Sequence, residues 1–127
     1  MAYKKSKKKN YRNIDSVVAH VKSTFNNTLV TVADTKGDVL LRGSAGILGF
    51  KGSRKGTPFA ATQVATKLAK DMLSIGVKLV EVNMQGPGPS RDSVVRALQS
   101  SGLVVTILRD VTPIPHNGCR ASKKRRN

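Results

Sequence analysis

Aromatic residues, cysteine and histidine are scarce in this chain, and each shortage excludes a class of site. There is no tryptophan, and the two tyrosines and three phenylalanines cannot build the stacking platform that reads single-stranded bases. The single cysteine, Cys119, excludes an internal disulfide, and with only two histidines the chain lacks a zinc ligand set. We therefore expect a protein of a reducing compartment with no metal cofactor.

Acidic residues and long apolar runs are also scarce. No apolar run approaches the ~20 residues that span a bilayer, so we expect a soluble protein. Only seven acidic residues stand against 23 lysines and arginines, which gives a formal net charge of +16. Such an excess predicts a polyanionic partner. Nucleic acid is favoured over a membrane surface, because the basic stretches carry no interleaved apolar face that could enter lipid.

The positive charge is concentrated at both ends of the 127-residue chain, whose length fits one domain. We predict a single α/β domain over residues 14–119 between a basic N-terminal tail, 1–13, and a basic C-terminal tail, 120–127. Both tails are expected to be disordered in the free protein, because they lack the apolar side chains that offset the entropy of ordering. The tail residues expected to contact phosphates are Lys4, Lys5, Lys7, Lys8, Lys9 and Arg12 at the start, and Arg120, Lys123, Lys124, Arg125 and Arg126 at the end.

Hydrophobic patterning predicts elements in the order β-β-β-α-β-α-β. Runs rich in β-branched residues predict an antiparallel meander of strands over 16–22, 28–33 and 39–41. Helical spacing of apolar residues predicts a long helix from Thr57-Pro58 to Gly76 and a short helix, capped by Ser90, that ends at Gly102. Further strands are expected over 77–84 and 103–108. The fold class is therefore α/β, with a five-stranded mixed sheet buried on both faces and helices on its faces.

Glycines recur at every third position from 43 to 52 and lead into a basic segment before the long helix. Glycine lets a backbone approach a polyanion closely, and the free N–H groups of a helix N-terminus favour a phosphate. The segment is not a nucleotide-binding P-loop, because position 51, five after Gly46, is lysine where that motif requires glycine. We predict contact with a phosphate backbone; a flexible loop with solvated charges is the alternative. The candidate contact residues are Lys51, Gly52, Ser53, Arg54, Lys55 and Gly56.

A second segment of small, rigid residues, 86–90, lies directly before the short helix. It predicts another backbone-contact site, with Arg91 and Arg96 on the polar side of that helix; a tight connection from strand to helix is the alternative. Both helix starts follow strands that run the same way. We therefore expect them at the same edge of the sheet, on one shared binding face.

Two phenylalanines carry different expectations. Phe25 lies in a turn beside Asn26-Asn27 and is the one aromatic residue that we regard as a candidate RNA contact. Phe59, at the start of the long helix, is expected in the core.

The acidic residues show no catalytic pattern. No pair is spaced so that it would converge on a metal ion, and the middle of the first strand, Val18-Ala19-His20, lacks the carboxylate that a nuclease of this topology would need. His116 has only Cys119 nearby, without a second acid or base that would complete a nucleophilic pair. We expect no enzymatic activity, no cofactor and no small-molecule substrate.

Asn117-Gly118 is a candidate site of chemical modification. Glycine after asparagine leaves the succinimide route to deamidation sterically open, although the same dipeptide also favours a tight turn. We predict slow formation of isoaspartate at Asn117 in the free protein.

Four motifs of the chain resemble those of a known family. They are Thr-Phe-Asn-Asn-Thr at 24–28, Gly-Phe-Lys-Gly-Ser-Arg-Lys-Gly-Thr-Pro-Phe-Ala-Ala at 49–61, Gly-Pro-Gly at 86–88, and Arg-Asp-Val-Thr-Pro-Ile-Pro-His-Asn-Gly-Cys-Arg at 109–120. In these motifs, and from about Arg12 to the last residue, the chain resembles small-subunit ribosomal protein eleven of the bacterial and organellar type.

The resemblance implies a ribonuclease-H-like fold without nuclease activity, located on the platform of the small ribosomal subunit. The ribosome would be that of a bacterial cytoplasm or of a plastid or mitochondrion. The implied partners are small-subunit ribosomal RNA, whose helices the protein would bridge, messenger RNA near the exit (Shine-Dalgarno) cleft, and the neighbouring small-subunit proteins seven and eighteen. On this basis Asn26, Asn27, His116 and Asn117 join the expected rRNA-binding residues.

The chain departs from the family pattern in two places. Ala121-Ser122 stands where the family usually has Pro-Pro, and the loss of two fixed φ angles should loosen residues 123–126 before assembly. Pro89-Ser90 puts a hydroxyl where the family has glycine, while Arg91 is retained. A free-standing nucleic-acid chaperone or histone-like protein would have the same charge and tails, and is the alternative function.

Overall fold

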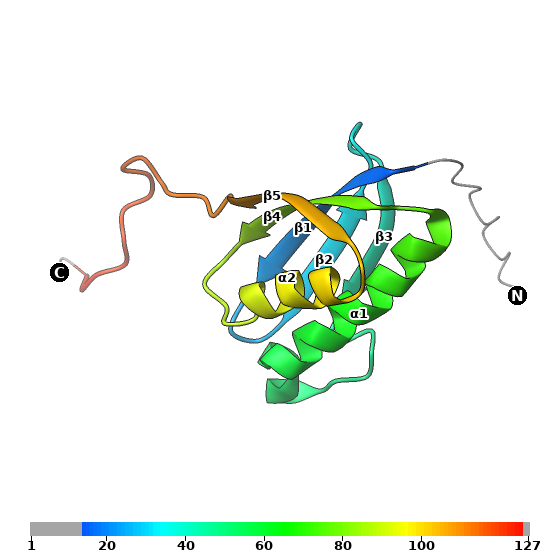
Figure 1. Ribbon diagram of the computed structural model, residues 1–127. Coiled ribbons are helices and arrows are strands. Elements are labelled where there is room, and N and C mark those ends of the chain that lie inside the picture. The colour runs from blue at the N-terminus through cyan, green and yellow to red at the C-terminus, as the bar shows by residue number, and fades with distance from the viewer. Residues whose placement is uncertain (1–13, 126–127) are drawn as a thin grey trace, which may run out of the picture.

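The computed structural model describes residues 14–125, which form a five-stranded sheet with two α-helices (Figure 1). This confirms the α/β fold class and the expected order of strands and helices. The elements are β1 (Ser16–Ser23), β2 (Thr28–Ala33), β3 (Val39–Ser44), the 3-10 helix η1 (Gly52–Gly56), α1 (Pro58–Ile75), β4 (Leu79–Gln85), α2 (Arg91–Ser100) and β5 (Val104–Asp110).

The sheet is mixed, with the strand order β3-β2-β1-β4-β5. The first three strands form the predicted antiparallel meander, in which Val21 of β1 lies opposite Val30 of β2. β1 also pairs in parallel with β4, and β4 pairs in parallel with β5. This topology agrees with the ribonuclease-H-like fold that the resemblance implies. It leaves β3 and β5 as the two edge strands.

The described helices cover one face of the sheet, so the expectation of burial on both faces is wrong. Buried and more exposed residues alternate along β1 and β4, which is the pattern of a sheet with one solvated face. Figure 1 shows both helices in front of the sheet, where α1 packs on β2 and β3, and α2 packs on β1, β4 and β5. The physical reason is the polar alternate positions of the central strand, Ser16, His20 and Lys22, which point away from the helices.

Several element boundaries differ from the sequence expectation. β3 continues to Ser44, so Gly43 belongs to the strand and not to the glycine-rich loop. The side of Gly43 that lacks a side chain packs on Val64 and Leu68 of α1, and this close approach explains why glycine suits a strand there. β5 ends at Asp110, two residues later than expected. The basic segment before α1 forms η1, which periodicity did not reveal because it is a single short turn.

The core lies between the helices and the covered face of the sheet. The α1 surface that faces the sheet consists mostly of alanines with Val64, Leu68 and Met72, and small residues let the helix pack closely on the strands. α1 begins as predicted: Thr57 caps it and Pro58 occupies the first helical position, while Gly76 ends it in a left-handed conformation. The buried cluster also contains Val17, Val21, Val80, Val82 and Leu98.

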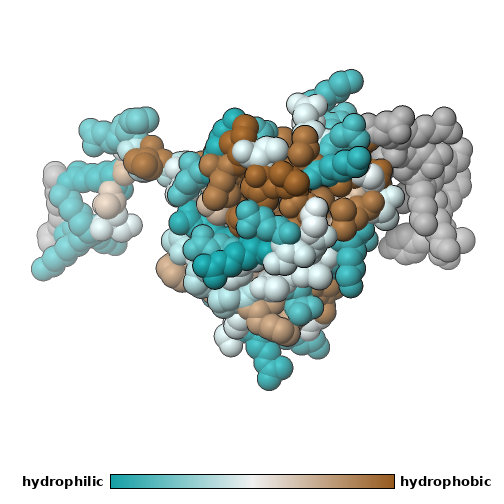
Figure 2. Space-filling view, in the orientation of Figure 1, coloured by the Kyte–Doolittle hydropathy of each residue, from teal (hydrophilic) through white to brown (hydrophobic). Residues whose placement is uncertain are grey.

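The two helices cover the outermost strand, β5, only in part: α2 packs against it, but most of its residues are exposed. Leu108 pairs in register with the buried Val82 and so faces the helix side, yet it is 52% exposed. Figure 2 shows apolar side chains gathered at the top of this view, where β5 runs beyond α2. The described helices therefore leave an apolar strip along one side of the domain.

Candidate nucleic-acid interface

Three segments that are far apart in the sequence meet at one edge of the sheet. They are the turn between β1 and β2, the residues just before α1, and the loop between β4 and α2. Gly88 N–H donates to the Ser23 carbonyl at 3.2 Å, and Ser90 Oγ lies 3.5 Å from the Gly56 carbonyl oxygen. The predicted convergence of the two helix starts on one edge is thus observed, and the β1–β2 turn joins them.

Glycines make this convergence possible. A Cβ added at Gly56 would lie 2.1 Å from the Phe25 carbonyl oxygen, and one added at Gly86 would lie 2.1 Å from the Ser23 carbonyl oxygen. A Cβ on Gly88 would meet the Ser23 hydroxyl. Since these neighbours are mostly main-chain atoms that cannot rotate away, side chains at these glycines would push the three segments apart. The glycines therefore serve close backbone contact within the protein.

The β1–β2 turn is held by its own polar groups and presents two side chains at its tip. Thr24 N–H donates to the Asn27 carbonyl at 2.9 Å, and Asn27 N–H donates to Thr24 Oγ1 at 3.0 Å. Asn27 Oδ1 accepts from Thr28 N–H at 2.8 Å, so this predicted contact residue also stabilises the turn. Asn26 is exposed and Phe25 is 72% exposed, which leaves both accessible to a partner.

The basic segment before α1 is held as a short 3-10 helix with most of its side chains exposed. Within the candidate set Lys51, Gly52, Ser53 and Arg54 are exposed, and Lys55 and Gly56 are half-buried. η1 has no buried residue, and its two basic side chains lie in its last turn. The Thr57 hydroxyl donates to the Arg54 carbonyl at 2.8 Å and accepts from Ala60 N–H at 3.3 Å. Thr57 thus fixes η1 against the start of α1.

Ser90 lies at the N-cap position of α2 but does not cap the helix with its side chain, contrary to expectation. Its backbone is already in the helical region, and its buried hydroxyl faces the carbonyl of Gly56. The first-turn N–H groups of α2 therefore receive no hydrogen bond from the Ser90 side chain. Asp92 is the acidic residue in that turn, and it complements the positive end of the helix dipole.

Arg91 is engaged within the protein, whereas Arg96 is exposed. Arg91 Nη1 lies 2.9 Å from Asp110 Oδ2 at the end of β5. A guanidinium has five N–H donors, so this single contact leaves others for a partner. Sequence reasoning placed Arg91 on the polar side of α2 but did not identify its carboxylate partner, which lies 19 residues away in the chain.

Asp110 and Thr112 form an anchor at the start of the C-terminal segment. Asp110 Oδ1 accepts from the Thr112 hydroxyl at 2.6 Å and from Thr112 N–H at 3.0 Å. Thr112 Oγ1 accepts from Gly86 N–H at 3.2 Å, and Val111 N–H donates to the Met84 carbonyl at 2.7 Å. The hydrogen bonds from Thr112, with the Arg91 guanidinium, lower the pKa of Asp110 from 3.8 to about 2. The spacing of an aspartate two residues before a threonine was the available sequence signal for this turn.

The C-terminal segment leaves the domain beyond this anchor. Figure 1 shows it running away from the sheet and helices, and residues 111–125 are exposed throughout. The candidate contacts His116, Asn117, Arg120, Lys123, Lys124 and Arg125 all lie on it. Asn117 has a positive φ of 56°, which fits a turn before Gly118. The candidates Lys4, Lys5, Lys7, Lys8, Lys9, Arg12 and Arg126 lie outside the described residues.

The expectation for Phe59 is wrong. Its side chain is 64% exposed at the first turn of α1 and meets the partly buried Phe50 edge to face, with ring centroids 6.1 Å apart. Pro58 and Phe59 precede the first buried residue, Ala60, so the apolar face of α1 begins one residue later than the pattern suggested. The exposed ring adds an apolar surface beside η1.

Metal-binding and membrane-spanning features are absent from the described part of the chain. Within residues 14–125, no group of three or more His, Cys, Asp or Glu side chains could hold a metal ion. None of the helices in this part of the chain is both long and apolar enough to cross a membrane. The chemistry that the edge offers is that of exposed cations, main-chain donors and a projecting basic segment.

Comparison with protein families agrees with this geometry. The family model described as Ribosomal protein S11 matches residues 17–126. The match spans β1 to the basic C-terminal segment, and it includes all four motifs on which the resemblance rests. The chain therefore belongs to the ribosomal protein S11 family.

Proposed function

We propose that this protein bridges several helices of small-subunit ribosomal RNA on the platform of the subunit, beside small-subunit proteins seven and eighteen and at the exit cleft for messenger RNA. Family membership makes the chain a small-subunit ribosomal protein that binds ribosomal RNA. The observation that supports the finer proposal is the edge where the β1–β2 turn, η1 and the start of α2 meet.

The mechanism is one of charge neutralisation on a fixed frame. Lys51 and Arg54 are exposed on the η1 side of this edge and Arg96 on α2, where they can contact phosphates and release bound counterions. The contacts between the three segments hold these cations at fixed positions, and such phosphate contacts set the register of a protein on RNA. The role is structural and breaks no covalent bond.

The direction of the C-terminal segment supports the proposed bridging. Arg120, Lys123 and Lys124 lie on a segment that projects from the domain (Figure 1), away from the compact edge that carries η1. Cations on two such separate surfaces reach phosphates of different RNA helices more readily than neighbouring phosphates of one helix. We therefore assign the edge and the segment to different helices.

A matched pair of triple variants tests the edge. Lys51→Ala with Arg54→Ala and Lys55→Ala removes three cations near η1. Lys36→Ala with Lys70→Ala and Lys78→Ala removes three exposed lysines elsewhere. Affinity for a small-subunit rRNA fragment should fall as salt rises. If the three edge cations contact phosphates, the first triple makes the slope of log affinity against log salt concentration less steep by about 2. The control triple changes it by less than half as much. Equal slopes for the two triples would contradict the proposed interface.

Ultraviolet cross-linking in cells tests the location. Reads of attached RNA should be concentrated at a few positions of small-subunit ribosomal RNA that belong to different helices. Reads spread over messenger RNA and other transcripts would instead support the free-standing nucleic-acid chaperone or histone-like protein.

A further inference from the structure

We propose that the free edge of β3 binds an extended segment of a neighbouring ribosomal protein, which adds a strand to the sheet and carries an acidic side chain next to Arg42. This surface differs from the proposed RNA interface, which is formed by the β1–β2 turn, η1 and the start of α2. It rests on two hollows beside β3, on the unpaired edge itself, and on the charge of Arg42.

Two hollows flank the same short stretch of β3. One, of about 380 Å³, lies on the open face of the sheet and is lined by Leu29, Val30 and Thr31 of β2. The other, of about 100 Å³, lies on the helix side and is lined by Leu48 and by Val64 and Leu68 of α1. Both hollows share the lining residues Arg42, Gly43, Ser44 and Ile47.

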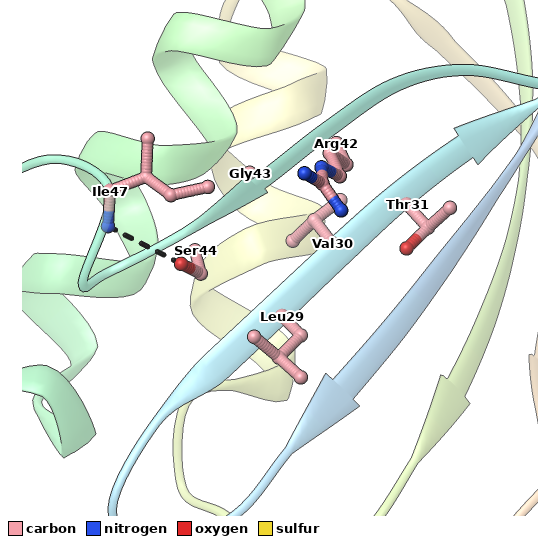
Figure 3. Close-up of a pocket in the computed structure, with 7 residues that line it drawn as sticks. All are labelled: Leu29, Val30, Thr31, Arg42, Gly43, Ser44 and Ile47. Carbon is pink, nitrogen blue, oxygen red and sulfur yellow. Dashed lines mark hydrogen bonds between the residues drawn. The ribbon is translucent and has the colours of Figure 1, made fainter.

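Figure 3 shows the larger hollow. Its wall is formed by Leu29, Thr31 and Arg42, and one end is closed by the loop that carries Ile47, whose N–H donates to Ser44 Oγ at 3.3 Å. Leu29 is 42% exposed and Ile47 is 61% exposed. These two aliphatic side chains give the hollow an apolar lining that is accessible from solvent.

The backbone of β3 supplies the second requirement. β3 is an edge strand, so alternate N–H and C=O groups point away from β2 and are available to another strand. Successive side chains of an added strand point to opposite faces. One residue of the partner would therefore enter the hollow on the open face, and the next would enter the hollow beside α1. Gly43, which lines both hollows, lies at the centre of this contact.

Charge and lining favour a protein over RNA as the occupant. Within residues 14–125, Arg42 forms no ion pair: the pairs that the structure shows are Arg91–Asp110 and Arg109–Glu81. A carboxylate beside the aliphatic side chains would match Arg42. In the smaller hollow the positive charge of Lys67 is balanced by the negative charge of Asp71. The charge of Arg42 is therefore the one for which a partner would supply a carboxylate. The other feature is the aliphatic lining, Leu29 and Ile47 in the larger hollow and Leu48, Val64 and Leu68 in the smaller one. Such side chains bury apolar side chains of a peptide but offer no hydrogen bond to a phosphate.

Photo-cross-linking in assembled small subunits tests the proposal. p-Benzoylphenylalanine is introduced in place of Ile47, and in place of Lys78 as a control at the other end of the domain. Subunits are purified after irradiation, and the cross-linked peptides are identified by mass spectrometry. We expect position 47 to cross-link to one protein segment in which aliphatic and acidic residues alternate, and position 78 not to reach that segment.

The charge of Arg42 is tested in the same system. Arg42→Glu should lower the yield of this cross-link about fivefold, the equivalent of about 1 kcal/mol, while Arg42→Lys retains most of it. Lys36→Glu makes the same change of charge at the β2–β3 turn and should leave the yield unchanged. Cross-links from position 47 only to RNA, only to residues 1–13 of this chain, or to nothing would each overturn the proposal.

Hydrogen exchange gives a measurement without any substitution. The β3 amides should exchange more slowly in purified small subunits than in the free protein. Unchanged exchange over residues 39–44 would overturn the added strand, even if a cross-link were found.

Discussion

Replacing Gly56 with alanine tests whether backbone contact holds the three segments of the interface together. A Cβ at this position would lie 2.1 Å from the carbonyl oxygen of Phe25 and 3.0 Å from its carbonyl carbon. Both are main-chain atoms, so no change of rotamer relieves the overlap, and either the β1–β2 turn or the start of α1 must move. Overpacking of this type costs about 1–3 kcal/mol, and we place Gly56→Ala near the upper limit because the backbone itself must shift.

Two other glycines separate the contributions. At Gly46 an added Cβ would have its nearest neighbours at 3.8 Å, an ordinary contact distance, and the residue has no positive φ. Gly46→Ala should therefore be neutral or stabilise by up to about 1 kcal/mol. Gly37 has open space around it but a φ of 100°, so Gly37→Ala should cost about 1–2 kcal/mol from backbone strain alone. The three variants thus separate the two effects. Gly46→Ala introduces neither, Gly37→Ala introduces backbone strain alone, and Gly56→Ala introduces steric overlap alone.

Thermal unfolding of the free protein and binding to a small-subunit rRNA fragment measure the outcome. For a domain of this size, 3 kcal/mol corresponds to a fall of about 10 °C or more in Tm. Gly56→Ala should show this fall and also weaken RNA binding at temperatures where it is folded, because the turn and η1 no longer share one frame. Gly37→Ala should lower Tm less and leave RNA affinity unchanged. Equal Tm values for Gly56→Ala and Gly46→Ala would refute the reasoning.

Two further predictions concern single groups. The Asp110 carboxyl should titrate at about 2 instead of 3.8 in a ¹³C NMR titration, because Thr112 and Arg91 hydrogen-bond its charged form. Because the pKa of Asp110 is lowered, its charged form stabilises the fold fully at pH values above 3.8, and this contribution is lost as the pH falls through about 2. Thr112→Val should raise the pH at the midpoint of the Asp110 titration. A wild-type midpoint near 4 would contradict the anchor. Asn117 should convert slowly to isoaspartate in the free protein, and peptide mass spectrometry measures the conversion. Gly118→Ala should slow the reaction. Intact Asn117 after prolonged incubation would refute this prediction.

Local signals in the sequence were sufficient for most of the fold. The Thr57-Pro58 start and Gly76 end of α1 were predicted because caps depend on residues next to them. The meander was predicted because β-branched runs and turn residues alternate over short distances. The convergence of the helix starts also followed, since the direction of consecutive strands fixes the edge at which each helix begins.

The errors arise where several elements act together. Whether one face of the sheet or both are buried depends on where the helices pack. The continuous apolar run in β5 suggested fuller cover than α2 provides. Ser90 has the residue type of a cap, but the approach of Gly56 redirects its hydroxyl. β3 was predicted too short because Gly43 resembles a loop residue until α1 is placed against it.

The pair Arg91–Asp110 changes how positive charge at the interface should be counted. With a pKa of about 2, Asp110 is ionised at neutral pH, so its charge offsets that of Arg91 at 2.9 Å. If Arg91 acts mainly by orienting the C-terminal segment, Arg91→Ala and Asp110→Ala should both weaken RNA binding. If Arg91 instead acts as a phosphate contact, Asp110→Ala would free it and strengthen binding. Glu81→Ala, which frees Arg109 on the open face of the sheet, supplies the control for the removal of one negative charge. We expect Asp110→Ala to weaken RNA binding relative to Glu81→Ala. The negative charge of Asp110 repels RNA, but its hydrogen bonds with Thr112 and Arg91 fix the direction of the C-terminal segment and so the positions of the cations on that segment.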